Sequence, residues 1–153
     1  MTDTKTFYLS VTGIVLKDGK ALITKRSAHE KAFPNRWTVP GGKVQASDYA
    51  TMQQNAGGLW YEVLEAALRR ELQEEVHLEV RNIQYVTSIA YTRPDGAPCV
   101  IISFFCDYKQ GEVQLCTALT EHAWVDLEEA KQYDLIEGIY DELALVFKNN
   151  PFK

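Results

Sequence analysis

Apolar and β-branched residues gather in short runs along the chain, and these runs predict a set of β-strands. The first run covers residues 7–16 and precedes Lys17-Asp18-Gly19-Lys20, in which Asp-Gly is a strong hairpin signal. A returning strand over residues 21–25 should complete this hairpin. Further strands are expected at residues 37–39, 80–91, 99–108 and 123–125, with a turn at 93–96 making a second hairpin.

The helical pattern is strongest between residues 61 and 76. Apolar residues recur there at spacings of three and four, namely at Leu64, Ala67, Leu68, Leu72 and Val76. Such spacing gives a helix one apolar stripe that can pack on a core. A helical turn at 127–131 and a final helix at 137–148 are also expected. The order of strands, helix, strands and helix predicts an α/β or α+β fold, with a mixed β-sheet and helices packed on it.

Residues 45–58 interrupt these patterns. They are polar, end in Gly57-Gly58 and show no clear periodicity, so we expect a surface insertion. The chain has 153 residues, the length of one domain, and no internal repeats. Residues 1–153 are therefore expected to form a single domain.

Composition and charge exclude several classes of protein. Hydrophobic residues make up 46% and charged residues 24%, as in globular proteins. The net charge of -5 argues against nucleic acid as a partner, because non-specific binding to its backbone needs a basic surface. A small anionic substrate remains compatible if a cation lies between the two charges. No apolar run approaches the roughly 20 residues that cross a membrane, and no signal peptide is evident, so we expect a cytoplasmic protein.

The three cysteines are Cys99, Cys106 and Cys116. Their odd number and the lack of C-x-x-C spacing argue against a disulfide framework or a zinc site. Cys99 and Cys106 lie in apolar, strand-like sequence, which predicts buried free thiols in a reducing compartment.

The segment Arg70-Glu71-Leu72-Gln73-Glu74-Glu75-Val76 concentrates acidic residues on the predicted helix. Spacings of three and four place Glu71 on the same surface as Glu74 and Glu75. Like charges at these spacings repel one another, and a hard divalent cation such as Mg²⁺, which prefers oxygen ligands, would offset that repulsion. A charged helix face is more often simply solvated. Gly41-Gly42-Lys43, before the helix, adds a loop that can approach another group closely, although glycine pairs are common in loops.

Taken together, these residues resemble the Nudix box, G-x5-E-x7-R-E-U-x-E-E-x-G-U, in which U is a bulky aliphatic residue. Gly42 matches the first glycine and Glu62 the first glutamate. The core of the box is matched by Arg70, Glu71, Leu72, Glu74 and Glu75, and its last aliphatic residue by Leu78. The flanking strands extend the resemblance over most of the chain.

The match departs from the pattern at two positions. Residues 43–61 separate Gly42 from Glu62 where the box has five residues, which we interpret as an insertion inside the box. His77 stands where the box has its second glycine, and we interpret it as a structural substitution at the helix end.

The resemblance implies the Nudix α/β/α sandwich, with a mixed sheet between helices, and a hydrolase that uses Mg²⁺ or Mn²⁺. It assigns the metal to Glu71, Glu74 and Glu75, and gives Arg70 the task of orienting these carboxylates. Gly42 and Lys43 belong to the cofactor-binding loop, and Glu62 is the outer glutamate that pairs with Arg70. The catalytic base varies within the family, which leaves Glu121 or one of the box glutamates as candidates.

The substrate implied by the resemblance is a nucleoside diphosphate derivative. A normal or modified nucleoside triphosphate, cleaved to a monophosphate and pyrophosphate, is favoured by the short chain. ADP-ribose or a nucleotide sugar is an alternative, as is a nucleotide-sensing module without catalysis, although such a module would be expected to have lost the glutamates. An isoprenoid diphosphate isomerase would need a catalytic cysteine, of which there is no sign. The sequence leaves open whether the chain forms a homodimer. The residues proposed to meet phosphates or stack on a base are Lys25, Arg26, Arg36, Lys43, Trp37, Trp60 and Tyr61.

Overall fold

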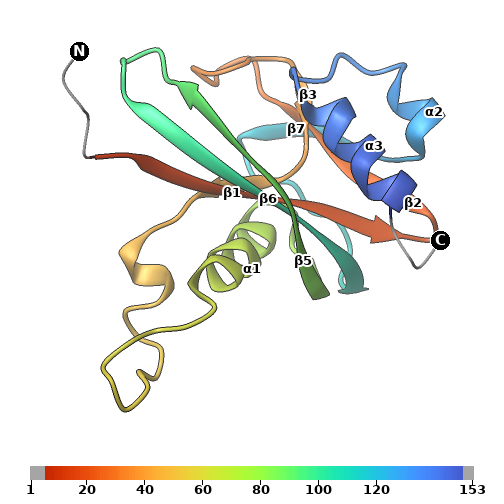
Figure 1. Ribbon diagram of the computed structural model, residues 1–153. Helices are drawn as coiled ribbons and strands as arrows, with labels where there is room; N and C mark the ends of the chain where they lie inside the picture. Colours follow the sequence, from red (N-terminus) through yellow and green to blue (C-terminus); the bar gives the residue numbers. More distant parts are fainter. Residues whose placement is uncertain (1–5, 150–153) are drawn as a thin grey trace.

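The computed structural model describes residues 6–149 and shows a mixed β-sheet with helices on both faces (Figure 1). The strands are β1 (Tyr8–Lys17), β2 (Lys20–Arg26), β3 (Trp37–Thr38), β4 (Gly41–Lys43), β5 (Glu79–Thr92), β6 (Pro98–Gln110) and β7 (Leu119–Val125). The helices are the short 3-10 helix η1 (Ala46–Asp48), α1 (Val63–Val76), α2 (Leu127–Ala130) and α3 (Ile139–Asn149). None of these helices is long and apolar enough to cross a membrane.

The two hairpins form as expected, and a parallel pair joins them. β1 and β2 turn at Asp18 and Gly19, whose φ values of 51° and 78° are those a two-residue hairpin turn needs. β5 and β6 pair antiparallel, whereas β1 runs parallel to β6. The strand order is β3-β2-β1-β6-β5, with β4 paired to β1 and β7 to β2. The prediction of a mixed sheet is confirmed.

The alternation of side chains along β1 and β2 builds a core on each face of the sheet. Val11, Val15 and Leu22 pack in one buried cluster with the apolar stripe of α1. Ile14 and Ile23 point the other way, into a second cluster with residues of α2 and α3. The molecule is therefore an α/β/α sandwich, as expected.

Both ends of α1 are set by residues in the left-handed region of the backbone. Glu62 precedes the helix with a φ of 58°, so that α1 begins two residues later than predicted. His77 follows it with a φ of 59°, and its Nδ1 lies 2.9 Å from the Gln114 carbonyl oxygen. The amide of Gln114 donates to the Val76 carbonyl, which supplies a partner for the helix end. His77 thus takes the conformation that the second glycine of the box would take.

Two elements differ from the prediction. β4 was not predicted, because Gly41-Gly42-Lys43 has no strand-like composition. It pairs with β1 so closely that a Cβ on Gly41 would lie 2.2 Å from the Val11 carbonyl oxygen. β7 begins at Leu119 rather than at 123, because the polar residues before 123 pair with the end of β2.

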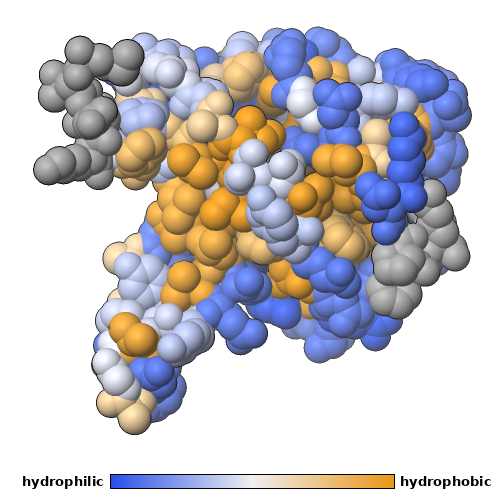
Figure 2. All heavy atoms as spheres, viewed as in Figure 1, coloured by the Kyte–Doolittle hydropathy of each residue, from blue (hydrophilic) through white to orange (hydrophobic). Residues whose placement is uncertain are grey.

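The segment 49–62, which we call the arm, projects from the sandwich (Figures 1 and 2). Every residue from 50 to 59 is exposed. Within the arm, the rings of Tyr49 and Trp60 lie 5.2 Å apart, and Trp60 Nε1 donates to the Met52 carbonyl oxygen at 3.1 Å. The arm is thus held together at its base, where it leaves and rejoins the body.

Candidate active site

Arg70 forms hydrogen bonds with two carboxylates of α1. Its Nη1 donates to Glu71 Oε1 at 2.6 Å and to Glu74 Oε2 at 3.1 Å. The side chain of Glu71 is buried and that of Glu74 is exposed. The ion pair with Glu74 joins residues four apart, which are neighbours on a helix surface.

Asp48 is the third partner of Arg70, and it was not predicted. Arg70 Nε donates to Asp48 Oδ1 at 2.5 Å, and Nη2 donates to Oδ2 at 3.1 Å and to the Lys43 carbonyl oxygen at 2.8 Å. The Asp48 side chain is 1% exposed, and its hydrogen bond with Arg70 lowers the pKa of this carboxyl. A two-pronged contact of this kind fixes the guanidinium plane. Arg70 therefore fastens the glycine loop and η1 to α1.

The expected pairing of Glu62 with Arg70 is wrong. Glu62 lies exposed at the start of α1, and within residues 6–149 it forms no ion pair. Five residues, 43–47, separate Gly42 from Asp48, which is the spacing of the box with aspartate in place of glutamate. The arm therefore enters the box after its outer acid rather than before it, and this spacing was the signal that could have revealed Asp48.

The glycine loop lies directly against the carboxylates of α1. A Cβ on Gly42 would lie 2.3 Å from Glu71 Oε1, so that any side chain there would displace the carboxylate. The amide of Gly41 donates to Glu75 Oε2 at 3.0 Å. Lys43 contributes its carbonyl oxygen to Arg70, while its Nζ lies 4.9 Å from the centre of the Tyr8 ring. The contact between β4 and α1 thus depends on glycine at position 42, whereas glycine at position 41 is needed for the pairing with β1.

Negative charge at Glu71 and Glu75 is incompletely compensated. Burial raises the pKa of Glu75 to about 7, against the opposing hydrogen bond from Gly41, and the charge of Glu71 adds to the increase. Burial also raises the pKa of Glu71, although Arg70 opposes it. A divalent cation would compensate these buried negative charges, and a set of oxygen donors alone suits Mg²⁺ or Mn²⁺. In the conformation described for residues 6–149, no three His, Cys, Asp or Glu side chains converge as a metal cluster.

Glu121 lies apart from these residues. It lies on β7 opposite Lys25 of β2, and Lys25 Nζ donates to its Oε2 at 3.0 Å. Its side chain is 57% exposed. Glu121 is thus held by β2, and it does not line the cavity that lies beside the glycine loop.

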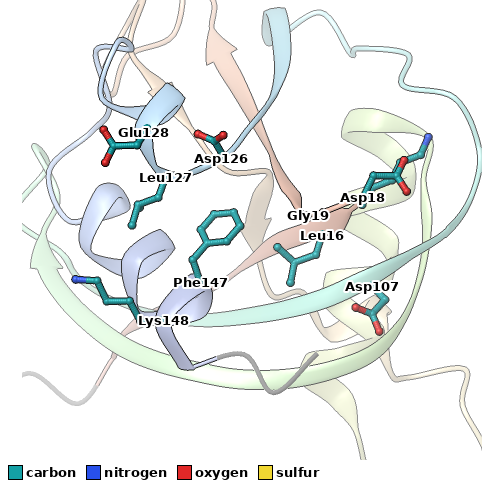
Figure 3. Close-up of a pocket in the computed structure, with 10 residues that line it drawn as sticks. Leu16, Asp18, Gly19, Asp107, Asp126, Leu127, Glu128, Phe147 and Lys148 are labelled. Atoms are coloured by element: carbon teal, nitrogen blue, oxygen red, sulfur yellow. The ribbon is translucent and has the colours of Figure 1, made fainter. Parts of the chain in front are cut away.

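A cavity of about 360 Å³ opens beside the glycine loop. Gly41 and Gly42 form part of its wall, and the rest comes from β1, β5, β6, the end of β2 with the segment 32–39, and the start of α3. Figure 2 shows hydrophobic surface near the centre of this view, where β5 and β6 cross in Figure 1. Another cavity, of about 690 Å³, lies between Leu16, Leu127 and Phe147 (Figure 3). It contains no residue of the glycine loop, whereas the smaller cavity is lined by Gly41 and Gly42, which contact Glu75 and Glu71, so the smaller cavity is the candidate substrate site.

Among the basic and aromatic candidates, Arg26 lines the cavity beside the glycines. Arg36 instead pairs with Asp134 and Glu137, and Lys25 pairs with Glu121. Two of the three aromatic candidates have structural contacts: Trp37 is buried against Tyr133, 4.7 Å between ring centres, and Trp60 packs within the arm on Tyr49. Tyr61 is exposed.

Comparison with known proteins places this site in a family. The model of the NUDIX domain matches residues 7–145. The chain belongs to the Nudix family. It is accordingly a Nudix hydrolase, and the Nudix resemblance and the expected fold are both confirmed.

Similar Nudix proteins include nucleoside triphosphatases. The chain is 27% identical over 136 residues to the nucleoside triphosphatase NudI of Klebsiella pneumoniae, covering 82% of this chain and 86% of that protein. It is 26% identical over 145 residues to NudI of Salmonella newport, covering 88% and 93%.

Solved Nudix structures share the fold. The crystal structure of a MutT NUDIX hydrolase from Burkholderia pseudomallei matches with a TM-score of 0.72 at 20% identity, over 93% of this chain and 99% of that one. The NUDIX domain of Shewanella oneidensis NrtR, in complex with ADP ribose, matches with a TM-score of 0.70 at 18% identity, over 95% and 89%.

Proposed function

We propose that this Nudix hydrolase cleaves a nucleoside triphosphate, normal or modified, to a monophosphate and pyrophosphate with the aid of Mg²⁺. The observation that supports this most directly is the contact of Glu71 and Glu75 with the glycine loop at the edge of a cavity. Carboxylates that could hold a cation thereby adjoin a space for the substrate. In such a site, the phosphates would lie at the glycine loop and the nucleoside would extend into the cavity.

In this proposal, Glu71, Glu74 and Glu75 hold the metal ion, and the Gly42 carbonyl oxygen completes the protein ligands. When bound, the ion neutralises phosphate charge and lowers the pKa of an attacking water. Arg70 keeps Glu71 and Glu74 in place, and Asp48 keeps Arg70 in place. Mn²⁺, which also prefers oxygen ligands, should substitute for Mg²⁺.

We assign the general base to a box glutamate rather than to Glu121. A base must come within hydrogen-bonding reach of the water that it activates. Glu121 is paired with Lys25 and does not line the cavity, whereas Glu75 is bonded to the amide of Gly41 in the cavity wall.

The size of the cavity favours a single nucleoside. At about 360 Å³ it is near the lower end of the range of roughly 300–1,000 Å³ for ligand sites. The similar proteins named nucleoside triphosphatases support the same substrate class. ADP-ribose and nucleotide sugars, which carry a second bulky group, are the competing substrates to be tested.

The decisive experiment measures phosphate release from a nucleotide panel with Mg²⁺ or excess chelator, with pyrophosphatase added to reveal pyrophosphate. The panel contains common and oxidised deoxynucleoside triphosphates, ADP-ribose, dinucleoside polyphosphates and nucleotide sugars. We expect metal-dependent release from triphosphates that requires the added pyrophosphatase. Turnover of ADP-ribose or nucleotide sugars alone would overturn the substrate, and binding without turnover would indicate a sensing module.

A further inference from the structure

A buried carboxyl group lies on the cavity wall contributed by α3. Glu142 is 5% exposed and Ser103 of β6 is 1% exposed, and both line the cavity. The Ser103 hydroxyl donates to Glu142 Oε1, and the Thr12 hydroxyl of β1 donates to Ser103 Oγ at 3.1 Å. Thr12 in turn pairs with Gly41 across β1 and β4. A chain of hydrogen bonds therefore leads from Thr12, which lies beside the glycine loop, to Glu142.

The direction of these hydrogen bonds leaves Oε2 of Glu142, a residue of the cavity wall, as an acceptor without a donor among the described residues. The single proton of Ser103 goes to Glu142, so Ser103 must accept from Thr12. Within residues 6–149, no group donates to Glu142 Oε2 and no Lys or Arg forms an ion pair with Glu142. The neighbouring Gly138 has no side chain that could cover this oxygen.

The surrounding charges do not compensate Glu142. Arg26 lines the same cavity, but its Nε donates to the Ala32 carbonyl oxygen at 2.8 Å and its Nη2 lies 3.8 Å from Glu30 Oε1. Burial raises the pKa of Glu142, and the negative charge of Asp141 adds to the effect. A buried acceptor with so few donors is costly. A ligand that donates an N–H hydrogen bond to this oxygen would therefore gain more binding affinity than from the same bond at an exposed site.

A carboxylate repels phosphate, so this wall suits the nucleoside end of a substrate. One free carboxylate oxygen matches an exocyclic amino group, as on cytosine or adenine, and glutamate is a known partner of the cytosine amino group in nucleic-acid recognition. Uracil, thymine and hypoxanthine place carbonyl oxygens beside their ring N–H groups. These oxygens would face the carboxylate unfavourably.

We propose that Glu142, held by Ser103 and Thr12, reads the base of the substrate by accepting a hydrogen bond from an exocyclic amino group. The protein then selects amino-bearing nucleotides over those with a carbonyl at the same position. This assignment rests on the proposed hydrolysis of nucleoside triphosphates, and it names Glu142 as the residue that determines specificity.

The test compares kcat/KM for two matched pairs, dCTP with dUTP and dATP with dITP. We expect the wild-type protein to prefer the amino member of each pair by tenfold or more, the range for a hydrogen bond to a charged group. Glu142→Gln should abolish or invert this preference, because an amide can also donate to a carbonyl. Asp141→Asn removes the same charge from the exposed neighbouring position and should leave the preference unchanged.

A binding measurement separates this inference from the proposed function, and a second variant covers the case in which Glu142→Gln does not fold. Calorimetric binding of dCMP and dUMP in chelator needs no hydrolysis, and Glu142→Gln should equalise their affinities even if no nucleotide is turned over. Ser103→Ala provides a second variant should Glu142→Gln fail to fold, and it should lower the preference by releasing Glu142. A wild-type preference for the carbonyl members, or a preference that neither variant changes, would overturn the assignment.

Discussion

Arg70 and Asp48 form a two-pronged ion pair that links the helix of the Nudix box to the turn just before the arm. The two hydrogen bonds measure 2.5 and 3.1 Å, and the side chain of Asp48 is almost fully buried. Because Arg70 also holds Glu71 and Glu74, the position of the proposed metal ligands depends on an aspartate that does not touch the metal.

Asp48→Asn should therefore lower activity much more than Glu62→Gln. Removing a partner that orients metal ligands typically reduces metal affinity or activity by about 10–100-fold. The loss should appear as a higher Mg²⁺ requirement and a lower kcat, with a smaller change in KM. Unfolding experiments should show a cost of about 1–3 kcal/mol for Asp48→Asn. Equal losses in the two variants would contradict the observed pairing.

Gly42→Ala tests the contact between the loop and α1. The added Cβ would lie 2.3 Å from Glu71 Oε1, and Arg70 restrains this carboxylate on its other side. We expect a loss of activity of tenfold or more and a higher Mg²⁺ requirement, with a fold that is kept. Gly57→Ala in the arm is the matched control, because its Cβ would meet Asn55 at an ordinary 3.4 Å. Wild-type kinetics in Gly42→Ala would show that Glu71 needs no such space.

Glu75→Gln should abolish hydrolysis without destabilising the metal-free protein. The charge of Glu75 is unfavourable when no cation is present, as its raised pKa shows, so neutralising it costs little. Glu74→Gln, at an exposed position, should likewise lose activity and keep its fold. Mg²⁺ at 100 times its dissociation constant should stabilise the wild-type protein by about 2.7 kcal/mol. Thermal melts with Mg²⁺ and with chelator measure this difference, which should shrink in both variants but persist in Glu65→Gln. Full turnover in either active-site variant would remove that glutamate from the metal site.

The three thiols should differ in reactivity. Cys106 is fully buried, and burial raises its pKa to about 12, so almost no thiolate exists at pH 8. Cys99 is 3% exposed, whereas Cys116 is only partly buried. Alkylation at pH 8 followed by mass spectrometry should label Cys116 first and Cys106 only after unfolding. Early labelling of Cys106 would indicate local opening of β6.

The periodic parts of the fold could be predicted from sequence because each has a local physical cause. The apolar stripe of α1 needs only the spacing from Leu64 to Val76, and the first hairpin needs only Asp18-Gly19. β4 has no such pattern, since its pairing depends on how closely Gly41 can approach β1. The parallel pairing of β1 with β6 joins distant segments, and no local signal encodes it.

The candidate site also has a part that could be predicted from the sequence and a part that could not. The shared surface of the α1 carboxylates could be predicted, because it follows from helix geometry. Asp48 was missed because the box was aligned on a glutamate, and Glu142 because a buried acid in an amphipathic helix has no distinguishing pattern. Both residues are hydrogen-bonded to neighbours that are remote in sequence, Asp48 to Arg70 and Glu142 to Ser103.

The place where the arm leaves the sandwich has a consequence for how such chains diverge. Tyr49 and Trp60 close the base of the arm, and the Asp48–Arg70 pair is complete on the side of the body. The entropic cost of closing a flexible loop rises only logarithmically with its length, by about 0.6 kcal/mol for each doubling. Segments of very different length could therefore be exchanged at this point while the spatial relation of Asp48 to Arg70 is preserved. In this chain the number of residues between the outer acid and the arginine of the box is not conserved, but the contact between Asp48 and Arg70 is kept. A search for relatives that allows a gap after residue 48 would therefore recover chains that the ungapped box pattern excludes.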